Sequence, residues 1–425
     1  MHPHAPKAYI NSMEYINEFI IYSILLILLY FQVFLLLTYF ERRKTFNIAK
    51  ELPEILPTVT AIVPCFNEEE TLERTVESLL ALDYPKEKLT IYLIDDGSTD
   101  NTPKLMEKYA AGFSQIKIFH KENGGKWRAL NLGIDKTTTE LVGCLDADSF
   151  VDKNALKELV SYFTHHPEIM AVTPSMRIWQ PNTIIRRIQY AEYDLGIFVR
   201  KVLSFLGAIH ITPGPFSIFR KKVFDILGPY KHAHNTEDLE IALRMQKAGM
   251  KIENAHKAIV YTVGPSSPYS LYKQRVRWTG GFLKNMIDYR EMFLNRSYGH
   301  LSIIILPMTI FSVLTALYFV TLTIVTTIIN IVRKIQELKL IGFALPEFNF
   351  NFEWFYINTE AVSFIGFALI ATTILCIYIG RLISNDKKFI TFDLFCFIFL
   401  YSFIAPFWLI KSVYNTITSQ EAKWR

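Results

Sequence analysis

Two carboxylates at a strand end are the residues of this sequence best placed to do chemistry. Asp146 and Asp148 lie one residue apart, directly after the mostly apolar segment 141–145. That segment is typical of a strand buried on both faces, and ligands bind at the carboxyl edge of an open α/β sheet. Because adjacent carboxylates repel each other, a divalent metal that holds a diphosphate would suit this position. The alternative is a solvated turn, since Asp and Ser favour turns.

Three further loops carry polar side chains beside predicted strands. In a parallel sheet these loops open on the same edge as Asp146 and Asp148. Carboxylates there can accept hydrogen bonds from a nucleobase or ribose, and glycines before a helix N-terminus suit a nucleotide phosphate. Each loop has a plain alternative as a turn or a helix entry, but together they predict a nucleotide-diphosphate site. The residues are Asn67, Glu68, Asp95, Asp96, Gly124, Gly125 and Lys126.

The elements that must position these residues alternate from residue 58 onward. Alternating strands and helices predict an α/β fold, with a mainly parallel sheet and helices on both faces. The predicted strands are residues 58–63, 89–94, 116–119, 141–145 and 169–173. The predicted helices are residues 69–82, 102–111, 126–136 and 153–163.

Composition indicates a membrane protein. Of the 425 residues, 51% are hydrophobic, which is high for a soluble chain. The four cysteines have no Cys-x-x-Cys spacing, so a zinc site or a disulfide scaffold is not predicted. Each of four apolar runs is long enough to cross a bilayer, which takes about 20 residues. These runs are about residues 20–40, 301–332, 361–383 and 389–410.

Basic residues beside the apolar runs predict the orientation of the chain. Arg42, Arg43 and Lys44 follow the first run, and Lys387 and Lys388 lie between the third and fourth. Because cytoplasmic loops are rich in Lys and Arg, both segments are expected inside and both termini outside. Three basic residues between 333 and 339 argue against this orientation. The predicted domains are an N-terminal span with a basic junction (1–50), a cytoplasmic domain (51–300) and a three-span region (301–425).

The ordered blocks resemble the motifs of family 2 inverting glycosyltransferases. The resemblance covers about residues 59–282 and implies a GT-A-like, Rossmann-type sheet. A late block, 274–278, resembles the Gln-x-x-Arg-Trp motif of membrane synthases that make cellulose, chitin, hyaluronan, poly-N-acetylglucosamine or nodulation chitooligosaccharides. The other blocks are Pro64-Cys65-Phe66-Asn67-Glu68, Asp95-Asp96-Gly97-Ser98, Asn123-Gly124-Gly125-Lys126, Asp146-Ala147-Asp148, Gly214-Pro215-Phe216-Ser217-Ile218-Phe219-Arg220 and Asn235-Thr236-Glu237-Asp238.

This resemblance implies a donor site for a UDP-sugar. A Mg²⁺ or Mn²⁺ ion held by Asp148, with Asp146 nearby, would stabilise the leaving diphosphate. Asp95 and Asp96 would hold the uracil and the ribose, and Lys126 would bind the nucleotide. Asn67, Glu68 and Asp146 complete the predicted donor-binding set.

The resemblance also implies a base and an acceptor site. Asp238, beside Glu237, is the predicted catalytic base, because a neighbouring carboxylate and apolar surface can raise a carboxyl pKa towards the working pH. Thr236 could instead cap the following helix, and both roles are compatible. The predicted acceptor and diphosphate ligands are Gln274, Arg275, Arg277 and Trp278. The alternative for Trp278 is an interfacial anchor.

Two mixed apolar and basic segments are predicted to form helices on the cytoplasmic membrane surface. They are about residues 183–206 and 268–295. The alternative for 183–206 is packing on the sheet.

The expected function is therefore a multi-pass cell-membrane glycosyltransferase that forms β-linkages by repeated transfer to a growing glycan. One alternative is a single transfer to a lipid acceptor. Another is a non-catalytic module that keeps the fold. Expected partners are the nucleotide sugar, the acceptor, membrane lipids, and a second copy or an export protein, but no nucleic acid.

Overall fold

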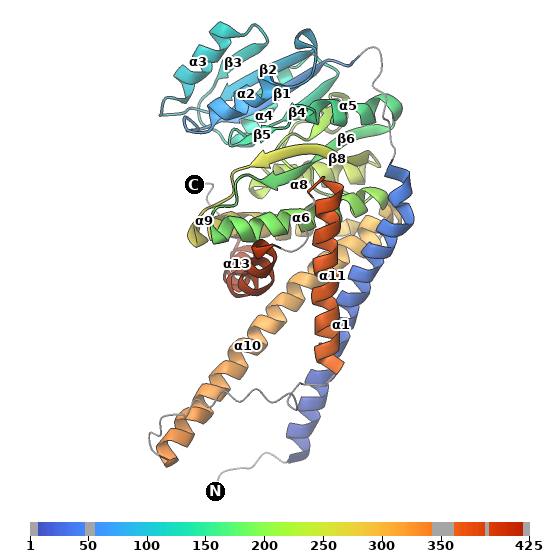
Figure 1. Cartoon of the computed structure of the whole chain (residues 1–425), viewed down its shortest axis with the longest axis vertical. Coiled ribbons are helices and arrows are strands. Elements are labelled where there is room, and N and C mark those ends of the chain that lie inside the picture. Colours follow the sequence, from blue (N-terminus) through green and yellow to red (C-terminus); the bar gives the residue numbers. More distant parts are fainter. Residues whose placement is uncertain (1–6, 47–55, 342–360, 387–390, 420–425) are drawn as a thin grey trace. The chain divides into compact units, whose positions relative to one another are not determined.

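The computed structural model describes residues 7–46, 56–341, 361–386 and 391–419 (Figure 1). Contacts divide the chain into two units. One unit comprises Met1–Phe34 and Met308–Ile374, and the other comprises Leu35–Pro307 and Leu375–Arg425. The second unit contains the whole sheet and all predicted site residues.

An eight-stranded mixed sheet forms the centre of the second unit, in the order β3-β2-β1-β4-β7-β6-β8-β5. Strands β1 to β4 pair in parallel, as predicted, whereas β7 pairs antiparallel with both β4 and β6, and β5 pairs antiparallel with β8. The α/β prediction is confirmed, but sequence alternation missed β5, β7 and β8. The bounds are β1 Val59–Cys65, β2 Leu89–Asp95, β3 Ile116–His120, β4 Leu141–Cys144, β5 Ser149–Val151, β6 Ile169–Ile178, β7 Ile218–Arg220 and β8 Lys251–Thr262.

Helices flank this sheet, and the central strands are buried on both faces. Every residue of β4 is buried, which explains its continuous apolar run. The helices of this region are α2 Leu72–Leu80, α3 Thr102–Gly112, α4 Lys126–Lys136, α5 Ala155–His165, α6 Ile184–Phe205, α7 Lys222–Leu227, α8 Glu237–Lys247 and α9 Pro268–Asp288. All four helices predicted between residues 69 and 163 are present.

Helix α6 packs between the sheet and the C-terminal helices. It contacts β6 and β8, and it also contacts α12 (Phe392–Phe395) and the π-helical turn Cys396–Leu400. Helix α13 (Tyr401–Ile417) packs along α9. Segment 183–206 therefore packs on the sheet, which was the alternative to the prediction, and its position on a membrane surface stays a prediction.

A buried ionic cluster joins α6 to the C-terminal helices. Nε of Arg381, a fully buried side chain on α11 (Ala361–Ile383), donates to Asp194 Oδ2 on α6 at 2.8 Å. Arg381 also pairs with Asp393 and donates to Thr391. Asp393 lies near the start of the fourth apolar run, and it is buried in this pair. A Cβ atom on Gly380 would lie 2.0 Å from the Asp194 carbonyl oxygen, so α6 and α11 cross where only glycine fits.

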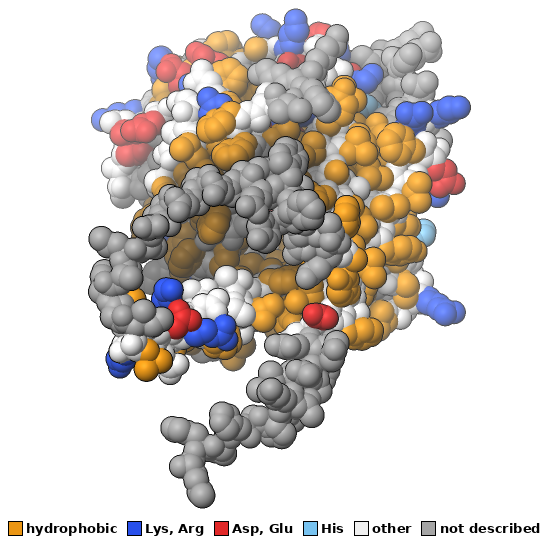
Figure 2. Space-filling view, turned by 60° about the horizontal axis from the view of Figure 1, so that its bottom comes forward, with side chains coloured by type: hydrophobic (Ala, Val, Ile, Leu, Met, Phe, Trp, Pro, Cys, Tyr) orange, Lys and Arg blue, Asp and Glu red, His pale blue; other side chains and the backbone are white. Residues whose placement is uncertain are grey.

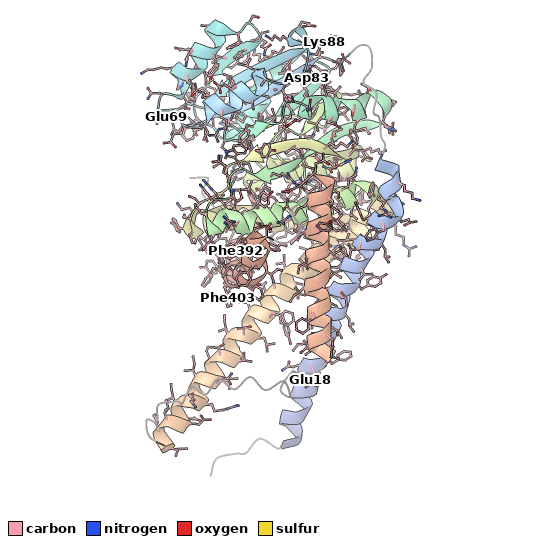
Figure 3. The ribbon with its side chains drawn as sticks, viewed as in Figure 1. Glu18, Glu69, Asp83, Lys88, Phe392 and Phe403 are labelled. Atoms are coloured by element: carbon pink, nitrogen blue, oxygen red, sulfur yellow. The ribbon has the colours of Figure 1, made fainter. Side chains whose placement is uncertain are left out.

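Four helices in the described part of the chain are long and apolar enough to cross a membrane. They correspond to the predicted runs, except that Lys387, Lys388 and residues 389–390 lie outside the described residues. Many of their hydrophobic side chains are exposed, and Figure 2 shows such side chains gathered on one face. Among them, Phe392 is 57% exposed and Phe403 is 74% exposed (Figure 3). The segments are Asn17–Arg42, Leu301–Leu340, Ala361–Ile383 and Phe392–Ile417, with α1 at Lys7–Arg42 and α10 at Leu306–Ile341.

Candidate active site

The carboxylates after β2 hold two loops in place. Asp95 Oδ1 accepts a hydrogen bond from the Ser98 backbone N–H at 2.9 Å. Asp96 accepts from the backbone N–H groups of Gly124 (3.1 Å) and Gly125 (2.9 Å), and it also pairs with Lys121. Both aspartates are buried. Asp96 therefore fixes the glycine turn that starts α4, while its predicted contact with the nucleotide stays a prediction.

The first loop is fixed in a similar way. Asn67 adopts a left-handed backbone (φ 55°), and its side-chain oxygen accepts from the Thr99 backbone N–H at 2.8 Å. The Glu68 backbone N–H donates to Thr102 Oγ1 at 2.8 Å, which ties this loop to the start of α3. These bonds place the β1 and β2 loops side by side at the carboxyl edge of the sheet.

Lys126 brings three distant segments together. Its Nζ lies 2.5 Å from Asp146 Oδ1, after β4, and 3.2 Å from Glu237 Oε1, at the start of α8. Burial alone would lower the pKa of Lys126, but Asp146 and Glu237 outweigh burial and raise this pKa well above its usual value. A Cβ atom on Gly214 would lie 2.7 Å from Nζ, so a larger residue at this position would require the Lys126 side chain to shift.

Asp238 lies in a pocket beside this ion pair. Burial, followed by the charge of Glu237, raises the pKa of Asp238 to about 6, although Lys126 acts in the opposite direction. A carboxyl group with such a pKa can take up a proton near neutral pH. The pocket is lined by Lys126, Leu130, Cys144, Thr212, Pro213, Gly214, Ser217, Phe219, Tyr230, Glu237 and Asp238.

Asp148 has the properties of a hard-metal ligand. Burial, together with the charges of Asp146 and Glu68, raises its pKa to about 6, so negative charge there lacks full compensation. Such a group gains from a nearby cation. No group of three or more His, Cys, Asp or Glu side chains in the described ranges could hold a metal by itself. Asp148 and Asp146 therefore fit an ion that takes its other ligands from substrate phosphate and water, as Mg²⁺ commonly does.

Residues 60–228 match the family described as "Glycosyl transferase family 2". The matched segment runs from β1 to α7. The chain is 33% identical over 274 residues to poly-β-1,6-N-acetyl-D-glucosamine synthase of Staphylococcus aureus, and 30% identical over 271 residues to the enzyme of that name from Staphylococcus epidermidis. Each alignment covers 63% of this chain, and 66% and 65% of the respective relatives. The chain thus spans just under two thirds of the length of these relatives.

The fold agrees with a solved glycosyltransferase. A mannosyltransferase from Pyrobaculum calidifontis, solved with GDP-mannose and Mn²⁺, superposes with a TM-score of 0.54 at 17% identity, covering 94% of this chain and all of that one. The predicted GT-A-like fold class is therefore confirmed.

The residues of the Gln-x-x-Arg-Trp motif on α9 lie in different surroundings. Arg275 is buried and donates to Glu192 Oε2 at 2.6 Å, and its guanidinium lies 4.5 Å from the Trp278 ring centroid. Burial lowers the pKa of Arg277, while Glu237 and Asp238 counteract this effect, which indicates that Arg277 faces the carboxylates. A contact of Arg277 with the diphosphate stays a prediction, as do the substrate contacts of Arg275 and Gln274.

Sequence reasoning missed residues of α6 that lie near the site. Burial lowers the pKa of Arg200 to about 10, and Tyr193 and Asp238 counteract it. Tyr193 in turn interacts with Arg275 and Asp148. Glu192 also accepts from Tyr401 at 3.1 Å, so it joins α6, α9 and α13. The sequence signal that could have revealed these residues is the presence of charged side chains in α6, a segment that was predicted to lie on the membrane surface.

An unusual loop precedes the Thr236-Glu237-Asp238 motif. Ala233, His234 and Asn235 all have left-handed backbones, with φ of 45°, 55° and 61°. For an ordinary L-residue this conformation costs about 1–2 kcal/mol, whereas Asn tolerates it better. Thr236 occupies the N-cap of α8 as predicted, but its side chain makes no cap hydrogen bond. Instead, Thr236 Oγ1 donates to the Ala233 carbonyl at 2.9 Å, because the left-handed turn brings that carbonyl within reach.

Proposed function

We propose that this chain is a membrane glycosyltransferase that transfers a sugar from a UDP-sugar, with inversion, to a growing β-linked glycan. The observation that carries the proposal is the meeting of Asp146, Lys126, Glu237 and Asp238 around one pocket. The Staphylococcus relatives, named as poly-β-1,6-N-acetyl-D-glucosamine synthases, support repeated transfer and N-acetylglucosamine as the sugar.

Asp238 acts as the base in this proposal. In its ionised form it takes the proton of the acceptor hydroxyl, whose oxygen then attacks the anomeric carbon from the face opposite the diphosphate. Glu237 and burial keep the pKa of Asp238 near 6, so the group is ionised at neutral pH yet basic enough to accept a proton.

Cationic side chains bind the leaving diphosphate. Lys126 and Arg277 supply positive charge among the four carboxylates, and an Arg can bind phosphate with two hydrogen bonds. Asp148, with Asp146, would hold Mg²⁺ or Mn²⁺, and that ion supplies further neutralisation of the diphosphate when bound. Trp278 offers an apolar ring for the acceptor sugar.

The active domain lies in the cytoplasm in this proposal, since basic residues follow the first apolar helix. A single transfer to a lipid is the second candidate, because it uses the same donor site. The non-catalytic alternative is disfavoured, because a module that only binds has no use for a base of raised pKa.

A donor panel on the full chain in lipid vesicles tests the proposal. UDP-N-acetylglucosamine, UDP-glucose, UDP-glucuronate and GDP-mannose are supplied with Mg²⁺ or Mn²⁺, and products are sized. We expect a ladder of products from UDP-N-acetylglucosamine. A one-sugar lipid would support the second candidate, and no product from any donor would refute the proposed activity. Asp238→Asn should abolish transfer and leave UDP binding intact.

A further inference from the structure

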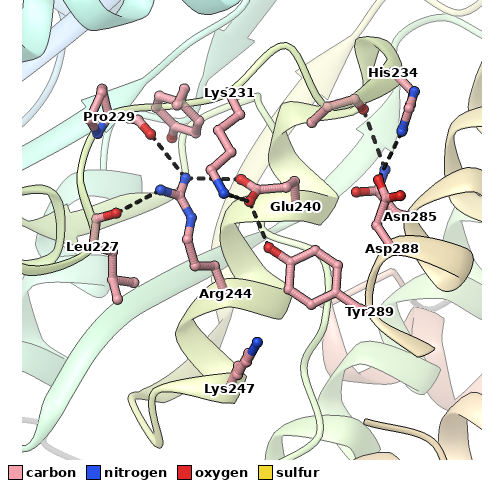
Figure 4. A network of polar contacts seen from close by, with 12 residues as sticks. Leu227, Pro229, Lys231, His234, Glu240, Arg244, Lys247, Asn285, Asp288 and Tyr289 are labelled. Carbon is pink, nitrogen blue, oxygen red and sulfur yellow. Dashed lines mark hydrogen bonds and ion pairs between the residues drawn. The ribbon is translucent and has the colours of Figure 1, made fainter. Parts of the chain in front are cut away.

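Helix α9 contacts the loop that presents Asp238 through a set of polar bonds. Asn285 is 1% exposed, and its Nδ2 donates to Thr236 Oγ1 at 3.0 Å and to the Ala233 carbonyl at 3.3 Å. One turn of helix away, His234 Nε2 lies 2.9 Å from Asp288 Oδ2. Both contacts come from α9, and both are made to the left-handed turn 233–235 or to the residue that follows it (Figure 4).

Close packing accompanies these bonds. A Cβ atom on Gly281 would lie 2.5 Å from Thr236 Cγ2 and 3.1 Å from the His234 carbonyl oxygen. Asn285 Nδ2 also lies 2.9 Å from the Gly281 carbonyl oxygen, so its two amide hydrogens are shared among three acceptors, while its Oδ1 is buried with no hydrogen-bond partner among the described residues. The amide side chain is therefore held by its own helix while it holds the loop.

We propose that Asn285 is a positioning residue for the catalytic base. Its amide holds the left-handed turn against α9, and this turn sets the backbone from which Glu237 and Asp238 face the pocket. Left-handed backbone at Ala233 and His234 is unfavourable by itself and persists only where surrounding contacts determine it. Asn285 supplies those contacts from α9, the helix that also carries Arg277 and Trp278. One rigid helix therefore positions both the predicted acceptor-binding residues and the catalytic base.

This inference rests on the proposed function for its kinetic consequence, but its structural part does not. Asn285 is not part of the pocket lining, and among the described residues its side chain donates to Ala233, Thr236 and Gly281 and not to the donor loops, so its loss should leave the donor site unchanged. A purely structural role would instead lower binding, stability and turnover together.

The test uses Asn285→Ala in the full chain in lipid vesicles. We expect kcat to fall at least tenfold, while the Kd for UDP stays within twofold. Hydrogen exchange of the backbone at residues 233–238 should become faster, with exchange in β1 to β4 unchanged. Tyr289→Phe is the matched control, because Tyr289 donates to Glu240 Oε1 at 2.7 Å in the same α8–α9 contact without touching the loop (Figure 4). This control should keep kcat and exchange at the values of the unaltered protein.

A second variant covers the case in which Asn285→Ala does not fold. Thr236→Val removes the hydroxyl that accepts the amide and keeps the shape of the side chain. It should give the same loss of kcat and the same faster exchange, and the double variant should be no worse than either single one. Unchanged kcat and exchange in these variants, or equal losses in Tyr289→Phe, would overturn the positioning role. If the unaltered chain transfers no sugar but Asn285→Ala still loosens residues 233–238, the proposed function fails and the structural part stands.

Discussion

Gly281→Ala probes the contact between α9 and the base-bearing loop with a single methyl group. The added carbon would lie 2.5 Å from Thr236 Cγ2 and 2.6 Å from Thr236 Oγ1, whereas ordinary contact begins at 3.4 Å. The loop and the helix must therefore separate by about 0.9 Å if neither side chain turns away. Thr236 cannot rotate easily, because it is β-branched and its hydroxyl is engaged by Ala233 and Asn285.

The size of the effect follows from opposing terms. Overpacking costs about 1–3 kcal/mol, while replacing glycine by alanine inside a helix returns about 0.5–1 kcal/mol. Stability should therefore change by only about 0–2.5 kcal/mol. A shift of about 1 Å at a reacting group costs about 10²-fold in rate, so kcat should fall far more than stability predicts.

Gly280→Ala is the matched control for this prediction. Among the described residues, nothing lies within 4 Å of a Cβ atom at Gly280, although it is the neighbouring residue on α9. The assay is UDP release and product sizing by the full chain in vesicles, with thermal unfolding of both variants. We expect near-normal turnover for Gly280→Ala and about a hundredfold loss for Gly281→Ala. A Gly281→Ala enzyme within twofold of the control would refute the reasoning.

Three other changes have distinct expected results. The transfer rate should fall below about pH 6, where Asp238 becomes protonated. Because Lys126 lowers the pKa of Asp238, Lys126→Met should move the acidic limb of the pH–rate profile to higher pH. At an effective dielectric constant of about 20, one nearby unit charge is worth about one pH unit or more, and an unmoved limb would contradict this prediction. Asp148→Ala should weaken Mn²⁺-dependent UDP binding without changing metal-free binding, measured by calorimetry with and without EDTA. Asp194→Asn should destabilise the folded chain by about 3 kcal/mol, because it leaves Arg381 buried with less compensation; an unchanged unfolding temperature would be inconsistent with this cluster.

Much of the first half of the domain was predictable, because its order is local. Strands β1 to β4 are short apolar runs separated by helices, and each βα unit follows from the chain itself. Strands β5 and β7 have three residues each, which is too short for an alternating pattern to show. They are strands only because β8 and β4 lie beside them.

The candidate site, too, was predictable from the sequence only in part. The residue types of Asp146, Asp148, Glu237 and Asp238 indicated carboxylate chemistry from the sequence, since their motifs are contiguous. Their meeting at Lys126 could not be read from it, because more than a hundred residues separate α4 from α8.

The sequence by itself determined the inventory of this chain: apolar runs, a βα alternation and ordered motifs, each set by local periodicity and residue type. Tertiary structure decided which of those groups face one another. It gave Arg275 a carboxylate partner in Glu192, turned Thr236 from a cap towards Asn285, and buried Asp393 against Arg381. Such pairings depend on long-range packing, in which the desolvation of each charge is offset only by a partner that the fold brings near.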